Sequence, residues 1–62
     1  MINVLELEPG TRLAMSGDVT AEVVSNPRDG TWIRVRYLSH PEEPDKVGTE
    51  ELVFAEDVLD LA

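Results

Sequence analysis

Apolar and polar residues alternate along most of this chain, and turn-forming residues interrupt the alternation about every ten positions. The clearest alternation spans residues 31–38, where Ile33, Val35 and Tyr37 would share one face of an extended strand. Five of these eight residues are β-branched or aromatic, a composition that disfavours helix. Regularly spaced segments of this kind predict an all-β domain.

Three shorter segments precede this strand. Residues 2–7 are interpreted as a first strand at the edge of the sheet, and residues 11–15 and 20–25 as the next two strands. The intervening stretches contain glycine, proline, asparagine or aspartate, which favour tight reversals of the chain. Two hairpins are therefore predicted, one closed by residues 16–18 and the other by residues 26–30.

A long irregular stretch follows the clearest strand. Residues 39–49 contain two prolines and a glycine and show no alternation. A loop of this length is unusual in so small a domain, which makes it a candidate functional element. A solvated connector between two strands is the alternative.

The C-terminal residues predict a strand, a short turn and a closing strand. In residues 50–54 we expect Leu52 and Phe54 to face the core. Residues 55–58 are too few for a stable α-helix and suit a single 3-10 turn, after which residues 59–62 would complete the sheet. The alternative is a terminal helix beginning at Phe54, because the later apolar residues also match helical spacing.

The length of the chain limits what it can contain. Sixty-two residues suffice for one domain, residues 1–62, and a domain of this size buries only about 60% of the surface of its unfolded chain. The absence of cysteine excludes disulfides and thiolate chemistry. Binding to a partner protein would add stability to so small a domain, and that partner could be a second copy of the chain. Neither a signal peptide nor a transmembrane segment is apparent, so we expect a cytoplasmic location.

The charge balance narrows the choice of partners. Thirteen acidic residues face five basic ones, giving a formal net charge of −8, and after position 40 Lys46 is the only basic residue. This charge repels phosphate backbones and anionic lipid surfaces and favours basic partners. We therefore expect a protein partner, with a basic one favoured, and neither nucleic acid nor a membrane. Solubility is the simpler interpretation of the same charge.

The order of the predicted elements resembles that of SH3-like barrels of the KOW and Tudor type. The resemblance covers residues 10–61, with two tight hairpins, one long loop, and then strand, short turn and strand. It implies a small barrel of about five strands with a short 3-10 turn before the last, used to bind peptides, methylated side chains, nucleic acids or protein domains. The chain is also similar to small stand-alone bacterial proteins of unassigned function, in the blocks 9–11, 32–38 and 47–51.

The sequence departs from each of these branches. Peptide-binding SH3 domains use several exposed aromatic residues, whereas this chain has three aromatics, and we expect Tyr37 and Phe54 to face the core. An aromatic cage for a methylated lysine is disfavoured because Trp32 and Tyr37 lie on opposite faces of one strand. The acidic charge opposes RNA binding of the KOW type.

Catalytic and metal chemistry have little support. His40 is the only histidine, and no serine or cysteine nucleophile stands at a recognised spacing from it. Together with Glu42, Glu43 and Asp45 it offers ligands to a divalent metal, but an acidic loop without EF-hand or histidine-rich spacing binds such ions weakly. We therefore expect a protein that is not an enzyme and uses no metal or cofactor.

Trp32, Arg34 and Arg36 form the first candidate contact surface, because tryptophan and arginine dominate the energetics of protein interfaces. The alternative is that the arginines pair with acids on the neighbouring strand, such as Glu22, while Trp32 covers the open end of the barrel. The second candidate is the long loop, through His40, Glu42 and Glu43.

The acidic last third supports a different hypothesis. Carboxylates spaced along a β surface can imitate a row of phosphates and occupy the groove of a nucleic-acid-binding protein. The residues that would form this surface are Glu50, Glu51, Glu56 and Asp57. The preferred hypothesis is a non-catalytic protein-interaction module or small accessory subunit, and a nucleic-acid-mimicking inhibitor is the alternative.

Overall fold

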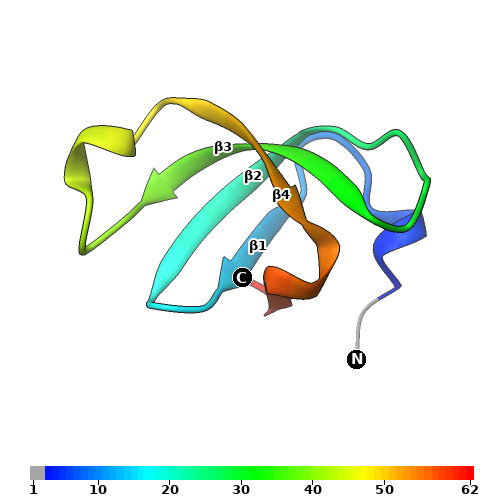
Figure 1. The fold of residues 1–62 in the computed structure, drawn as a ribbon, viewed down its shortest axis with the longest axis horizontal. Helices are drawn as coiled ribbons and strands as arrows, with labels where there is room; N and C mark the ends of the chain where they lie inside the picture. The colour runs from blue at the N-terminus through cyan, green and yellow to red at the C-terminus, as the bar shows by residue number, and fades with distance from the viewer. Residues whose placement is uncertain (1–2) are drawn as a thin grey trace.

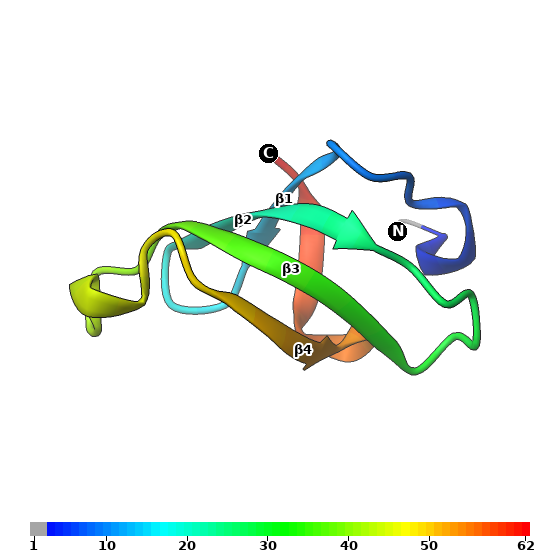
Figure 2. The same cartoon turned by 90° about the horizontal axis from the view of Figure 1, so that it is seen from above.

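Five antiparallel strands form one curved sheet in the computed structural model, which describes residues 3–62. Their order across the sheet is β4-β3-β2-β1-β5, so the last strand pairs with the first. Figures 1 and 2 show how the chain turns after β4 and runs back beside β1, which wraps the sheet around a single core. The strand bounds are β1 (Arg12–Met15), β2 (Val19–Ser25), β3 (Trp32–Ser39), β4 (Glu50–Phe54) and β5 (Val58–Leu61).

The apolar residues that alternate along β1 and β3 are the buried residues of these strands, and the residues between them lie on the outer face. In β3, Ile33, Val35 and Tyr37 are buried, as predicted, while the residues between them lie on the outer face. The same pattern holds in β1, where Leu13 and Met15 point inward. The core consists of Leu7, Leu13, Met15, Val19, Ala21, Val23, Ile33, Val35, Tyr37, Val53, Ala55 and Val58.

The first hairpin closes as predicted. Gly17 and Asp18 both adopt positive φ angles, 78° and 59°, between the paired residues Met15 and Val19. Glycine reaches this conformation without steric cost, and aspartate tolerates it better than most residues. These two positions therefore fix the register of β1 against β2.

The prediction of a strand over residues 2–7 is wrong for the described part of that segment, and its start at Ile2 lies outside the described residues. Val4–Glu6 form a single 3-10 turn, η1, whose preceding residue Asn3 accepts a hydrogen bond through its side chain from the Leu5 N–H at 3.1 Å. A side-chain cap of this kind favours a helical turn over an extended conformation.

Asn26, in the loop between β2 and β3, holds η1 against the sheet. Its side-chain amide donates to the carbonyl oxygens of Val4 and Leu7, at 2.7 and 3.0 Å, and its Oδ1 accepts from the Arg28 N–H at 2.9 Å. The conformation of the N-terminal segment therefore depends on a side chain about twenty residues away, which local pattern cannot reveal.

The prediction that Leu52 and Phe54 face the core is also wrong. Strand β4 pairs with β3 in a register that aligns Ile33 with Val53, and Val53 is the buried residue of β4. Because side chains alternate between faces, Leu52 and Phe54 lie on the outer face, with 49% and 50% of their surface exposed.

The end of the chain follows the predicted sequence of elements. Ala55–Asp57 form the 3-10 turn η3, and β5 begins at Val58, one residue earlier than predicted. The alternative of a terminal helix is therefore wrong. The predicted fold class is confirmed in that the chain is all-β, with five antiparallel strands and a 3-10 turn before the last. Across residues 3–62, no helix has both the length and the apolar character that crossing a membrane requires.

Candidate functional site

Two aromatic side chains stack on the outer face of the sheet. Trp32 and Phe54 lie directly opposite each other in the β3–β4 ladder, with ring centroids 4.2 Å apart and ring planes inclined by 23°. Both are exposed, Trp32 by 38%. A pair of this geometry contributes about 0.5–1.5 kcal/mol beyond the area that it buries. The rings therefore hold each other in place while they remain accessible.

The position of Trp32 is fixed by the turn that precedes it. The Asp29 carboxylate accepts hydrogen bonds from the backbone N–H groups of Thr31 and Trp32, at 2.8 and 3.0 Å. These bonds, with that to Trp32 as the main cause, lower the pKa of Asp29 below its usual value. The first residue of β3 is therefore anchored by its backbone, which leaves its side chain free to face outward.

The two arginines lie on the same face, two and four rungs further along the ladder. Arg34 lies opposite Leu52, and Arg36 lies opposite Glu50. The Arg36 guanidinium contacts Glu22 Oε1 at 3.3 Å on one side and Glu50 Oε2 at 3.2 Å on the other. The alternative that the arginines pair with neighbouring acids is therefore confirmed for Arg36, with Glu22 as the named partner.

Arg34 is less tightly held. Its nearest carboxylate oxygen, on Glu50, is 4.0 Å away, and both side chains are about two-fifths exposed. An exposed pair at this distance contributes about 0–1 kcal/mol. Arg34 can therefore turn toward a partner at small cost, whereas Arg36 cannot do so without leaving two carboxylates.

These side chains define one surface, which we call the outer patch: Trp32, Arg34, Leu52 and Phe54. Arg34 and Arg36 supply two formal positive charges, and the neighbouring Glu22 and Glu50 supply two negative ones, so the formal charges cancel. The whole chain carries −8. Together with the neighbouring Arg36, Glu22 and Glu50, the outer patch therefore forms a formally neutral, aromatic surface on an acidic molecule.

A small pocket lies beside the aromatic pair, at the junction of β4 and η3. Its volume is about 180 Å³. Pockets for small-molecule ligands occupy about 300–1,000 Å³, so this one suits a single side chain better than a metabolite or cofactor. The lining residues are Gly30, Thr31, Phe54, Ala55 and Glu56.

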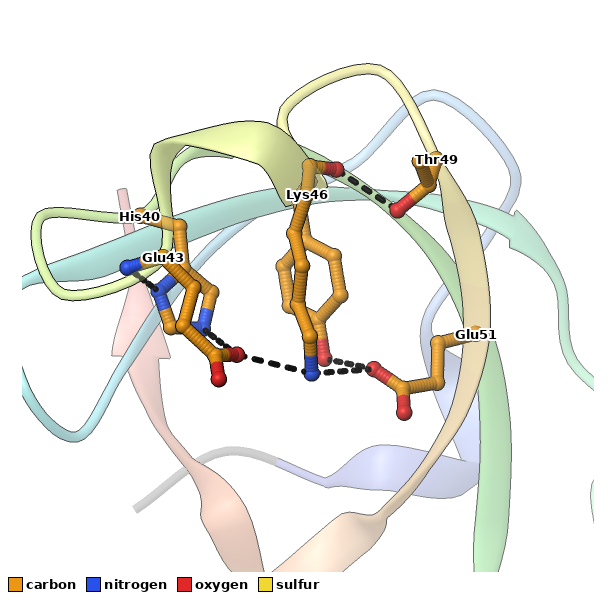
Figure 3. A network of polar contacts seen from close by, with 6 residues as sticks. His40, Glu43, Lys46, Thr49 and Glu51 are labelled. Atoms are coloured by element: carbon orange, nitrogen blue, oxygen red, sulfur yellow. Dashed lines mark hydrogen bonds and ion pairs between the residues drawn. The ribbon is translucent and has the colours of Figure 1, made fainter.

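The long loop is held together by its own polar side chains, as Figure 3 shows. Lys46 Nζ lies 3.0 Å from Glu43 Oε2 and 3.6 Å from Glu51 Oε2. The Tyr37 hydroxyl donates to the same Glu51 oxygen at 2.6 Å, and His40 Nδ1 accepts from the Glu43 N–H at 3.2 Å. The network fixes the loop on the end of β3.

The electrostatics of this network are consistent with its geometry. Burial, followed by the hydrogen bond and charge of Glu51, raises the pKa of Tyr37 to about 12. The hydrogen bond from Tyr37 is the main cause that lowers the pKa of Glu51, and Lys46 adds to it. The pKa of Lys46 is raised, chiefly by its contact with Glu43. Each group is thus held in its usual charge state at neutral pH.

The structure therefore separates the two predicted contact regions. Trp32 begins β3, while His40 follows its other end, so the loop and the aromatic pair lie at opposite ends of the strand (Figure 1). His40 and Glu43 are engaged within the loop network, and Glu42 is exposed. In this structure the contacts of His40 and Glu43 stabilise the loop itself.

The four carboxylates of the predicted acidic surface do not form a uniform row. Glu50 contacts Arg34 and Arg36, and Glu51 contacts Lys46 and Tyr37. The other two, Glu56 and Asp57, are exposed on η3, and among residues 3–62 they form no ion pair. In the same range, no group of three or more histidine, aspartate or glutamate side chains is placed to hold a metal ion.

Sequence reasoning found half of the outer patch. Trp32 and Arg34 were expected on the outer face, and they lie there. Leu52 and Phe54 were missed because they were placed in the core. The pairing register of β4 against β3 was the missing information.

Comparisons with known proteins add no family to this description. The scan against protein-family models matches no family, and neither the search of curated proteins nor that of solved structures finds a match.

Proposed function

We propose that this chain is a non-catalytic protein-interaction module or small accessory subunit that binds its partner through the outer patch. The observation that carries the proposal is the exposed stack of Trp32 on Phe54, continued by Leu52 along the same face. Large aromatic side chains left on the surface of a small domain are the residues that most often dominate binding energy at protein interfaces.

The charge and shape of the surroundings favour a protein over other ligands. The net charge of −8 repels nucleic acids, although a single-stranded base could stack on an exposed tryptophan. The pocket beside the patch is smaller than a typical metabolite site. A neutral aromatic surface next to Arg34 matches the composition of a protein-interface core.

The test is capture of partners from the native lysate by the tagged chain, washed at low and at high salt. Trp32→Ala combined with Arg34→Ala should abolish capture, because it removes the aromatic anchor and the arginine that can reorient. Leu59→Ala is the matched control, since Leu59 is more exposed than Trp32 but belongs to β5, at the other end of the strand order from β4. A folded double variant that captures the same proteins as the unaltered chain would contradict the proposal.

The nucleic-acid-mimicking inhibitor stays a prediction that the same experiment can distinguish. Under that hypothesis the captured protein is itself a nucleic-acid-binding protein and is lost at high salt, because screening weakens charge attraction. Reversal of Glu56 and Asp57 to lysine would then abolish capture while the Trp32 variant would leave it intact. Salt-resistant capture that depends on Trp32 is the result expected for the interaction module.

A further inference from the structure

Strand β4 has a free edge. Within residues 3–62 it pairs only with β3, and it ends one side of the strand order. The Ala55 N–H donates to the Thr31 carbonyl oxygen at 2.8 Å, and the Tyr37 N–H donates to the Thr49 carbonyl oxygen at 3.0 Å. In an antiparallel pair, hydrogen-bonded positions alternate along the strand. Positions 51 and 53 of β4 therefore bond to β3.

The intervening residues, Glu50, Leu52 and Phe54, direct their backbone N–H and C=O groups away from β3 by the same alternation. Their side chains lie on the outer face, where Leu52 and Phe54 belong to the outer patch. The free edge thus offers backbone donors and acceptors directly beside exposed apolar side chains. Such an edge is a template for another extended segment.

The charge along this edge is uneven. At its start, Glu50 is engaged by Arg34 and Arg36, so the edge is close to neutral there. At its end, the pocket is lined by Phe54 and by Glu56, and Glu56 is not engaged by a cation in the described part of the chain. A carboxylate beside an aromatic ring attracts a positively charged side chain by charge and by cation–π contact.

We propose that the partner protein adds an extended segment to the free edge of β4, with an apolar side chain against Leu52 and a lysine or arginine in the pocket formed by Phe54 and Glu56. This inference rests on the proposed function and specifies the chemistry of the partner. Backbone pairing with residues 50, 52 and 54 supplies the register, and the pocket selects the basic residue.

Charge complementarity identifies this occupant in preference to a second copy of the chain. Pairing of β4 with β4 of another copy would bring together two copies of η3, each carrying Glu56 and Asp57 without an ion pair among the described residues. Like charges facing each other across strands are destabilising, and each copy carries a net charge of −8. A basic segment is attracted by the same groups.

The experiment selects a phage-displayed library of random nine-residue peptides against the full chain. Sequences with alternating apolar residues and a lysine or arginine toward one end are expected to be enriched. The most enriched peptide is then synthesised, and its dissociation constant is measured by calorimetry. Amide chemical shifts of the isotope-labelled chain should change most at Glu50, Leu52 and Phe54 when the peptide binds.

Two variants test the two parts of the contact. Leu52→Pro removes a backbone N–H that β3 does not use, and it should weaken binding by about tenfold or more, whereas Leu52→Ala, which keeps the N–H, should weaken it less. Glu56→Gln keeps the size of the side chain and removes its charge, and it should weaken binding by about fivefold or more. Circular dichroism checks that each variant is folded. If Leu52→Pro unfolds the chain, the inference is judged by the Glu56→Gln variant and by the chemical shifts of the unaltered chain.

Several results would overturn the inference. They are a library that yields no enriched peptide, enriched peptides without basic residues, shifts confined to another surface, or equal binding by the Glu56→Gln variant. Sedimentation that shows a dimer broken by Leu52→Pro would assign the edge to a second copy instead. If lysate capture depends on Trp32 while these peptide tests fail, the proposed function stands and only the edge pairing is wrong.

Discussion

Tyr37 combines a buried ring with a hydroxyl that reaches the half-exposed carboxylate of Glu51. The ring packs in the core and makes an edge-to-face contact with the His40 ring, with centroids 5.2 Å apart. One side chain therefore connects the core to the loop network. The loop is ordered because the core is ordered, and this dependence has a measurable signature in the protonation of the hydroxyl.

We expect Tyr37 to titrate near pH 12 in the folded chain, against about 10 in the unfolded chain. Because the folded pKa is the higher one, the neutral phenol stabilises the fold fully below pH 10, and this contribution is lost as the pH rises through 12. It is the only tyrosine, so the absorbance of tyrosinate during an alkaline titration reports this group alone. A midpoint near 10 in the folded chain would contradict the structure.

Two variants separate the causes of this shift. Glu51→Gln removes the neighbouring charge and should lower the Tyr37 pKa toward 10, with burial keeping it above that value. Tyr37→Phe should abolish the tyrosine contribution to the loss of stability between pH 10 and 12. The pKa of Lys46 is also raised, so the comparison is made with the unaltered chain at each pH.

At the scale of the elements, β4 shows how strongly one pairing register determines a surface. Val53 and Ala55 are small and buried, while the larger Leu52 and Phe54 are exposed. A shift of one residue would exchange these sets and place the aromatic ring inside. The outer patch therefore exists only in the observed register.

The register predicts opposite outcomes for two neighbouring substitutions. Val53→Ala should lower the free energy of unfolding by about 1–2 kcal/mol, because it removes two buried methyl groups and leaves a cavity. Leu52→Ala should change it by less than about 0.5 kcal/mol, since that side chain is half exposed. Urea unfolding followed by circular dichroism measures both. The reverse ranking would show that Leu52 faces the core.

The elements differ in how far the sequence determines them. The strand over residues 31–38 was predictable because its apolar residues occur on one face only, and the same alternation placed Trp32 and Arg34 outside. Strand β4 and the residue that follows it offer an apolar pair in either register, Leu52 with Phe54 or Val53 with Ala55, and only the pairing of β4 with β3 decides between them. Local alternation therefore gives the strand but not its inward face.

The remaining misses have the same origin in distant contacts. The N-terminal turn η1 is held by Asn26, which is remote in sequence, so the local pattern of residues 2–7 resembled a strand. The aromatic pair of the candidate site likewise joins residues 22 positions apart, Trp32 and Phe54. Sequence reasoning could place each side chain on a strand, but it could not bring two strands into register.

For the whole molecule, the excess of negative charge is the dominant electrostatic feature. Thirteen acidic residues face five basic ones, and four of the six ion pairs among residues 3–62 join side chains that are about two-fifths or more exposed. Exposed pairs contribute little, about 0–1 kcal/mol each, whereas the unbalanced charges repel one another throughout the fold. Repulsion should therefore outweigh attraction at low ionic strength.

We expect the melting temperature to rise by a few degrees when sodium chloride is increased from about 0.01 to 0.3 M, because screening weakens the repulsion between carboxylates. Potassium chloride at the same ionic strength serves as the control and should have the same effect if screening is the cause. Circular dichroism during heating measures the transition. A fall in melting temperature would show that the ion pairs of Arg36 and Lys46 dominate instead.

Because Trp32 stacks on Phe54 at the surface, tryptophan fluorescence can report on binding at the outer patch. Trp32 is the only tryptophan, so the tryptophan emission of the chain comes from the outer patch and not from the core. A ligand that covers the indole and excludes water should shift its emission to shorter wavelength without any added label. If the core loosens while Trp32 stays paired with Phe54, the tryptophan emission should not change. Binding at the outer patch and loosening of the core can therefore be followed separately.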